Sequence, residues 1–257
     1  MMNNQTQKSG FTVYDLAVFS FLFGSLFICW HFGALRTATL ILSIVAVLLV
    51  LLVFLTLRAS LKSPGGTLGA GRKFLHLVGG SALVLGVILL PSELPFLALS
   101  LLGTYLVYEE CRWGIVRRQL WLSTALAFFG SPEETSRRPF WEAILGMTAI
   151  SLVLSLFKTE VALAAIVNLT FGDGIAGLAR ERLGEEARSF SVRKGWRGSL
   201  IGMLSSALVI LMLTGNTSLL IPIVVGMIVE RLPIPIDDNF TVPVSTALSA
   251  WLLSIQG

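Results

Sequence analysis

Charged side chains are scarce in this chain. Only 13% of its 257 residues are Asp, Glu, Lys or Arg, whereas 54% are hydrophobic. A soluble domain carries charges at about a quarter of its positions, so this composition argues against a soluble globular protein. The mean hydropathy of +0.82 instead predicts a polytopic membrane protein.

Cysteine pairs and an arginine-rich leader are also lacking. Cys29 and Cys111 lie far apart and form no C-x-x-C motif, which argues against a disulfide framework and a zinc site. Residues 1–10 contain a single Lys and no Arg, unlike an organelle transit peptide. We therefore expect a multi-pass protein of a prokaryotic cytoplasmic membrane. Its net charge of +4 reflects membrane topology rather than a nucleic-acid partner.

Long apolar runs fill most of the sequence. A span needs about twenty apolar residues to cross roughly 30 Å of hydrocarbon. The runs predict an all-α integral membrane protein, a bundle of about nine transmembrane helices in a single domain over 1–257, with the first two spans in 1–60. The predicted spans are 12–32, 37–57, 74–90, 94–110, 140–157, 160–179, 199–214, 217–231 and 240–256.

The basic residues orient this bundle. With the N-terminus on the cytoplasmic side, all 19 Lys and Arg residues except Arg36 and Lys158 fall on that side, as the positive-inside rule requires. A tenth span at 119–130 would move the later basic clusters to the other side. We therefore expect a surface-lying or re-entrant helix there.

Unusual polar residues gather on the cytoplasmic side, and Asp173 is the most informative. It follows an apolar run, where a carboxylate is costly and marks a functional site by default. Gly172 and Gly174 flank it and favour a helix break or a close approach of a ligand. Downstream, Arg193 and Lys194 precede a new span, whose first backbone amides are suited to phosphate.

Two further clusters lie on the same side. Arg72, Lys73 and His76 enter the third predicted span, where positive-inside anchoring explains them equally well. Glu109 and Arg112 end the fourth, as an interfacial pair would.

A late loop brings several acids together. Glu230 ends one predicted span, and Asp237, Asp238 and Asn239 open the next after two prolines. Helix capping accounts for one of these side chains. Adjacent carboxylates with an amide also predict a site for a hard cation such as Mg²⁺.

In this order, the motifs resemble the CTP-dependent polyprenol kinase family, which includes dolichol kinases, phytol kinases and a CTP-dependent diacylglycerol kinase. The resemblance covers about 71–243. It rests on RKFLH at 72–76, GDGIAGLARERLG at 172–184, KGWRGS at 194–199 and VERLPIPIDDNFTVP at 229–243.

The resemblance implies a membrane-embedded kinase that transfers the γ-phosphate of CTP to a lipid alcohol at the cytoplasmic face. The alcohol would be an isoprenoid such as phytol, geranylgeraniol or dolichol, and Mg²⁺ would be the cofactor. Asp173, Lys194 and His76 would be catalytic, with His76 or Asp173 as the base. The implied metal ligands are Asp173, Glu230, Asp237 and Asp238. The implied nucleotide-binding residues are Arg72, Lys73, Gly172, Gly174, Arg193, Lys194, Gly198, Ser199 and Asn239.

Three positions depart from the family pattern. Gly177 stands where phytol kinases often carry a second Asp, Arg180 where the family commonly has a small residue, and Gly195 where it has Ser or Thr.

Two alternatives remain open. A phosphatidate cytidylyltransferase-like enzyme also binds CTP, but 191–198 lacks the Pro and Glu of that family's basic loop. A transporter also places acids in broken helices, but it does so near the midplane.

Overall fold

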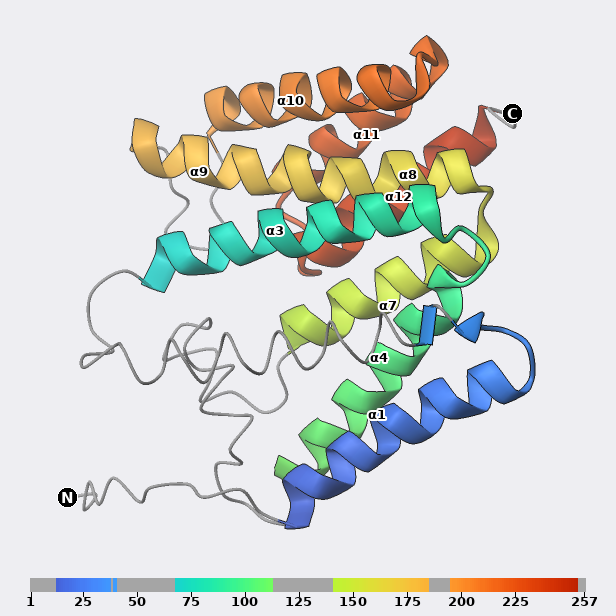
Figure 1. Cartoon of the computed structure of the whole chain (residues 1–257). Helices are drawn as coiled ribbons and strands as arrows, with labels where there is room; N and C mark the ends of the chain where they lie inside the picture. The colour runs from blue at the N-terminus through green and yellow to red at the C-terminus, as the bar shows by residue number, and fades with distance from the viewer. Residues whose placement is uncertain (1–12, 38, 41–67, 113–140, 185–194, 254–257) are drawn as a thin grey trace, which may run out of the picture. The chain divides into compact units, whose positions relative to one another are not determined.

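The computed structural model describes residues 13–37, 39–40, 68–112, 141–184 and 195–253 (Figure 1). Every regular element within these ranges is a helix, which confirms the all-α prediction. The chain forms two compact units, one from residues 1–68 and 100–140 and the other from 69–99 and 141–257. Helix α4 (Leu94–Glu110) begins in the second unit and ends in the first.

The first unit is built on α1 (Val13–His31) and the later part of α4. Val18, Tyr108 and Cys111 form its buried apolar cluster. A local ion pair lies beside this cluster, with Arg112 Nη2 3.1 Å from Glu109 Oε2. Glu109 and Arg112 therefore pair within one turn, in a buried position; their place at a membrane interface stays a prediction.

One long helix forms the centre of the second unit. It comprises α8 (Thr159–Val167), the π-helical turn η2 (Asn168–Asp173) and α9 (Gly174–Leu183). In the most apolar stretch of this long helix, 72% is buried inside the protein. The corresponding buried share is 22% in α1 and 28% in α10. Because α8 is apolar on every face and lies inside the protein, it can be enclosed on all sides by other helices.

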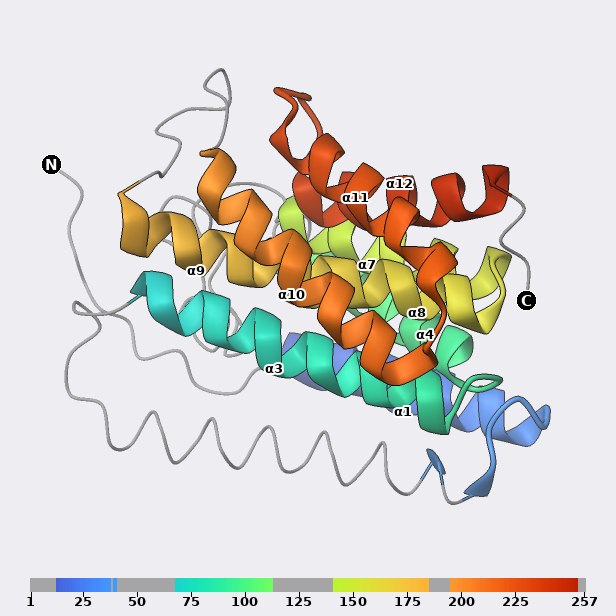
Figure 2. The ribbon, with the colours of Figure 1, turned by 90° about the horizontal axis from the view of Figure 1, so that it is seen from above.

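Five helices surround this central helix (Figures 1 and 2). Helices α10, α11 and α12 contact η2, and α7 packs on α8 and α12. On another side, His76 of α3 bonds the carbonyl of Leu169 in η2. The bounds are α3 (Leu68–Leu89), α7 (Trp141–Leu156), α10 (Trp196–Thr214), η3 (Thr217–Leu219), α11 (Leu220–Arg231) and α12 (Asp238–Leu252).

Three described helices are long and apolar enough to cross a membrane: 13–31, 159–183 and 196–214. This is fewer than the nine predicted spans. The other predicted spans in the described ranges coincide with helices, but α4, α7, α11 and α12 have only 12 to 17 residues. One physical reason is visible at α11, which stops just before Pro233. Most of 37–57 and all of 119–130 lie outside the described residues, so the number of crossings stays a prediction.

Candidate active site

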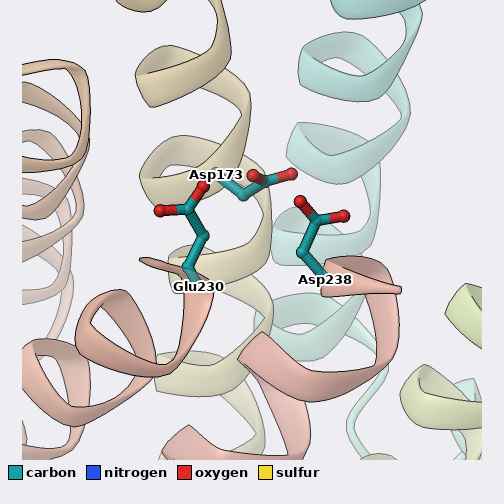
Figure 3. Close-up of side chains that lie close together, drawn as sticks. All are labelled: Asp173, Glu230 and Asp238. Atoms are coloured by element: carbon teal, nitrogen blue, oxygen red, sulfur yellow. The ribbon is translucent and has the colours of Figure 1, made fainter. Parts of the chain in front are cut away.

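Three carboxylates from separate parts of the sequence meet at one end of the central helix. Asp173 closes η2, Glu230 lies in the last turn of α11, and Asp238 is the first residue of α12. One oxygen of each lies within 4.8 Å of the others, and Figure 3 shows the three groups converging. The prolines after Arg231 end α11, and the chain returns within a few residues to place Asp238 beside Glu230.

The donor set suits a hard divalent cation. Mg²⁺ takes oxygen ligands at about 2.1 Å and usually combines one or two carboxylates with waters and phosphates. In an octahedral shell the ligand oxygens lie roughly 3–4 Å apart, so these carboxylates need only a small closure to share an ion. The Glu230 side chain is fully buried, whereas the Asp173 side chain is 15% exposed. The cluster is therefore accessible from the Asp173 side.

Asp237 lies beside this cluster but has a different local task. Its Oδ1 accepts a hydrogen bond from the Asn239 amide at 2.9 Å, which makes it the N-cap of α12. Capping satisfies one of the otherwise unpaired amides of the first turn. The structure thus brings together three of the four acids predicted to hold the metal, and the metal-binding role of Asp237 stays a prediction.

Arg180 of α9 penetrates the acidic cluster. Its Nη1 lies 2.8 Å from Glu230 Oε1, and its Nη2 lies 3.8 Å from Asp173 Oδ1. The same Nη1 lies 3.3 Å from the Ser199 hydroxyl. That hydroxyl donates to the other Glu230 oxygen at 2.9 Å. Both oxygens of Glu230 therefore have partners from neighbouring helices, α9 and α10.

Small residues allow α10 to approach this close. A Cβ on Gly198 would collide with the Arg180 side chain, and one on Gly202 would collide with the backbone of Gly172 and lie 2.8 Å from Ala176 Cβ. Gly198 and Gly202 are four apart, so they share one face of α10 and form a small-residue helix contact. Gly198 and Ser199, which the sequence assigned to the nucleotide, are therefore also required for this packing.

The π-helical turn is held by one buried amide. The Nδ2 of Asn168 donates to the Ile223 carbonyl at 3.1 Å and to Thr246 Oγ1 at 2.9 Å. Its Oδ1 accepts from the Ser206 hydroxyl at 3.1 Å. One side chain thus joins η2 to α10, α11 and α12, the three helices that carry Ser199, Glu230 and Asp238.

His76 and the glycines beside Asp173 complete the surroundings. His76 Nε2 lies 2.9 Å from the Leu169 carbonyl, and because a carbonyl only accepts, this nitrogen carries a hydrogen. A Cβ on Gly174 would lie 3.0 Å from the His76 ring, and one on Gly172 would lie 2.8 Å from Met227 Sδ. Both glycines therefore permit close helix contact around the acid.

The other predicted nucleotide-binding residues are less defined. Asn239 lies against Gly146 of α7. A Cβ added to Gly146 would lie 3.3 Å from the Cβ of Asn239. Arg72 and Lys73 lie in α3, and their side chains are outside the described part of the structure. Arg193 and Lys194 also lie outside the described residues.

Curated relatives place the chain among known proteins. It is 28% identical over 202 residues to probable phytol kinase 2 of Oryza sativa subsp. japonica, a match that covers 71% of this chain and 65% of that protein. It is 28% identical over 143 residues to the phytol kinase of Synechocystis sp., covering 51% and 61%. The chain is a homologue of the phytol kinases. This finding confirms the resemblance that the ordered motifs indicated.

The match to probable phytol kinase 1 of Oryza sativa is 27% identical and covers 44% of that relative. This phytol kinase homologue thus spans about half of the length of the curated relatives it matches. No family model and no solved structure matches the chain.

Two residues of the phytol kinase homologue were not predicted as site residues. Arg180 was visible only as a departure from the family pattern, and its pairing with Glu230 joins positions fifty residues apart. Asn168, five residues before Asp173, carried no predicted role. The sequence did contain a signal for Asn168, because it is a polar amide that follows the apolar residues of α8 directly. A buried amide needs several hydrogen-bond partners.

Proposed function

We propose that the chain is a membrane-embedded kinase that transfers the γ-phosphate of CTP to the hydroxyl of an isoprenoid alcohol such as phytol. The observation that carries the proposal is the convergence of Asp173, Glu230 and Asp238 within 4.8 Å. These residues come from two of the four motifs by which the chain resembles the polyprenol kinases. Its relatives are named phytol kinases, which supports an isoprenoid alcohol as the acceptor.

The reaction needs positioning and charge neutralisation more than covalent chemistry. Phosphoryl transfer proceeds through a state whose charge lies on the phosphate oxygens. Asp173 and Asp238, with Glu230 behind them, would hold Mg²⁺, which supplies that neutralisation when bound. Lys194, Arg193 and Lys73 are proposed to neutralise the remaining phosphate oxygens, because the described cluster itself is dominated by negative charge.

The hydrogen bond of His76 restricts the proton transfer. Its Nε2 is engaged with the Leu169 carbonyl, so only Nδ1 is left to accept a proton from the alcohol. Asp173 is the second candidate base, and its partly exposed carboxylate lies in the cluster itself. An experiment can distinguish the two candidates, because His76→Gln keeps a side-chain amide that can donate to the Leu169 carbonyl but removes the imidazole that would accept the proton.

Exposed apolar surface supports a membrane location for this site. Leu204, Leu208 and Met212 repeat every four residues on α10 and are 58%, 60% and 77% exposed. They form one stripe of the helix, on the side away from Gly198 and Gly202, which contact α9 and η2. A stripe of large exposed apolar side chains fits contact with lipid. We place the cluster at the cytoplasmic face, where nucleotide is available.

The test is transfer of label from γ-labelled CTP to phytol, geranylgeraniol, a longer polyprenol or diacylglycerol, with purified protein in detergent and Mg²⁺. Label should enter the lipid fraction, and Asp173→Asn should reduce the rate by about a hundredfold or more, as loss of one electrostatic group in a site does. The matched control is Glu160→Gln, an exposed acid at the opposite end of the same helix. Parallel reactions with ATP, GTP and UTP identify the donor.

Two other outcomes would contradict the kinase proposal. Formation of CDP-lipid from phosphatidate, without label transfer to any alcohol, would establish the cytidylyltransferase alternative. The absence of both reactions in a folded protein would overturn the kinase proposal.

A further inference from the structure

Arg231 follows Glu230 directly in the sequence, and the proposed function assigns it no task. It is the last residue of α11 and is partly exposed. Its Nε atom is buried and has no hydrogen-bond partner among the residues that the structure describes. Most buried polar atoms of a native protein are hydrogen-bonded, so each exception calls for a physical explanation.

The position of Arg231 on α11 places it beside the three carboxylates. Ile223, Met227 and Arg231 follow one another at intervals of four residues, so they lie along one stripe of the helix. Ile223 and Met227 are buried. Their stripe faces the central helix, because a Cβ on Gly172 would lie 2.8 Å from Met227 Sδ. Arg231 therefore lies one turn beyond the contact with Gly172, at the end of α11 that carries Glu230.

The direction of the side chain fits this placement. Long side chains of a helix lean back toward its N-terminus, which carries the stem of Arg231 over the turn that holds Met227 and Glu230. The buried Nε agrees with such a path. The partial exposure of the residue leaves it open to a ligand from solution.

Arg180 and Arg231 differ in what their guanidinium groups contact. Arg180 is only 8% exposed, and its Nη1 lies 2.8 Å from Glu230 Oε1 and 3.3 Å from the Ser199 hydroxyl. Nε of Arg231 has no such acceptor among the described residues. The Nε and Nη hydrogens of a guanidinium form a planar pair of donors that matches two phosphate oxygens. A phosphate is thus a ligand that would satisfy this donor.

We propose that Arg231 binds the triphosphate of the nucleotide, through Nε and one Nη, on the Glu230 side of the carboxylate cluster. The inference rests on the proposed function, which places the nucleotide at these carboxylates. It deepens that function, because it adds a described residue to a phosphate site otherwise assigned to Lys73, Arg193 and Lys194. The charge on the phosphate oxygens is what such a residue neutralises.

A membrane anchor is the competing role for this arginine. Basic residues at the cytoplasmic ends of membrane helices commonly face lipid headgroups. The two roles differ in the ligand, which is a soluble triphosphate in one case and an anionic lipid in the other. Both ligands can be offered to the same protein.

Calorimetric titration with CTP and Mg²⁺, in detergent and without an alcohol, tests the contribution of Arg231 to binding. Arg231→Gln should weaken binding by about tenfold or more, because a charge-assisted hydrogen bond is lost. Its melting temperature should match that of the wild type. Arg231→Lys, which keeps the charge but loses the paired donors, should bind with intermediate affinity. Arg182→Gln is the matched control, since it removes one positive charge from an exposed position of α9, and it should bind as the wild type does.

The same titration with inorganic tripolyphosphate identifies the part of the nucleotide that Arg231 contacts. Arg231→Gln should weaken the binding of tripolyphosphate by a similar factor. Unchanged affinity for CTP in Arg231→Gln would overturn the inference. A loss for CTP but not for tripolyphosphate would also overturn it, because the contact would then be with the base or the ribose.

Chemical modification of the wild-type protein provides a test that needs no variant, so it decides the matter even if the variants do not fold. Phenylglyoxal modifies accessible arginines, and mass spectrometry of the digested protein identifies them. CTP with Mg²⁺ should slow the modification of Arg231 and leave that of Arg182 unchanged. Protection of Arg231 by phosphatidylglycerol in mixed micelles, but not by CTP, would show a lipid anchor and overturn the inference.

These measurements separate the inference from the kinase proposal. A protein that phosphorylates no alcohol, but binds CTP with the stated dependence on Arg231, retains the inference and loses the proposed function. An active kinase whose affinity for CTP is the same in Arg231→Gln retains the function and loses the inference.

Discussion

Arg112 and Arg180 are buried to nearly the same degree, 5% and 6% exposed, yet they are paired in different ways. Arg112 bonds Glu109, three residues earlier in the chain, and the second oxygen of Glu109 has no hydrogen-bond partner among the residues that the structure describes. Arg180 bonds Glu230 from another helix, and Ser199 satisfies the second oxygen of that carboxylate.

The two arginines differ in what their pairing requires of the fold. A local pair forms whenever its helix forms and costs no loop closure. The Arg180 pair exists only if α9, α10 and α11 meet, and buried ion pairs are weak evidence for stability in themselves. Burial alone therefore does not single out a candidate site. Pairing across several helices, beside further carboxylates, is the more specific observation.

Neutralising the two acids in turn gives the largest expected contrast. Glu230→Gln should lower the phosphorylation rate by about a hundredfold or more, because both Arg180 and the cation site lose a charge. Glu109→Gln should change the rate of the folded protein by less than about threefold, since Glu109 pairs locally with Arg112 and is not one of the three converging carboxylates; its loss is expected in stability instead. The labelled-CTP assay on monodisperse protein measures both, and equal losses would refute the distinction.

Asn168→Leu should have the next largest effect, on stability. It removes bonds to Ile223, Thr246 and Ser206 and leaves buried polar groups unsatisfied, at about 1–3 kcal/mol each. At about 2–4 °C per kcal/mol for a chain of this size, thermal unfolding should show a clear fall in melting temperature.

The matched pair for Asn168 lies on α10. Ser206→Ala should cost about 1 kcal/mol, while Ser205→Ala, whose exposed hydroxyl bonds only the carbonyl of Ile201 in its own helix, should cost almost nothing. If Asn168→Leu has the same melting temperature as the wild type, the hydrogen bonds of Asn168 between helices do not stabilise the fold.

Gly202→Ala tests the close approach of α10 to η2. The added methyl would collide with the Gly172 backbone, which cannot rotate away, so overpacking of about 1–3 kcal/mol is expected. Gly79→Ala is the control, because a Cβ there meets nothing within 4 Å. Denaturant titration of both variants in detergent gives the two free energies of unfolding. That of Gly202→Ala should be the lower, and a lower value for Gly79→Ala would contradict the prediction.

The smallest effect is expected at Asp237. Asparagine caps a helix as well as aspartate does, whereas alanine costs about 1 kcal/mol. Asp237→Asn should therefore keep the stability of the wild type, and Asp237→Ala should lower it. A strong loss of bound Mn²⁺ in Asp237→Asn would instead show that Asp237 is a metal ligand.

The sequence was sufficient to predict the helical class and much of the carboxylate cluster. Apolar runs with few charges specify helices directly, and an acid after such a run is conspicuous. The sequence could not show that Asp237 caps α12 while its neighbour Asp238 joins the cluster, because that division depends on the direction in which the helix starts. Nor could it show the pairing of Arg180 with Glu230, which depends on how closely Gly198 lets two helices approach.

The π-helical turn has a consequence for the whole face of the central helix. Each residue of an α-helix advances the rotation by about 100°, so the wider turn at Asn168–Asp173 changes the phase between α8 and α9. A regular α-helix with the same number of residues would turn α9 by about one further residue step, about 100°, and would carry Asp173 and Arg180 away from Glu230 together, without removing any of them. Deleting one residue of the turn would instead allow a regular helix that keeps the present phase of α9. The π-helical turn is thus what lets the central helix hold one extra residue while both side chains still face Glu230.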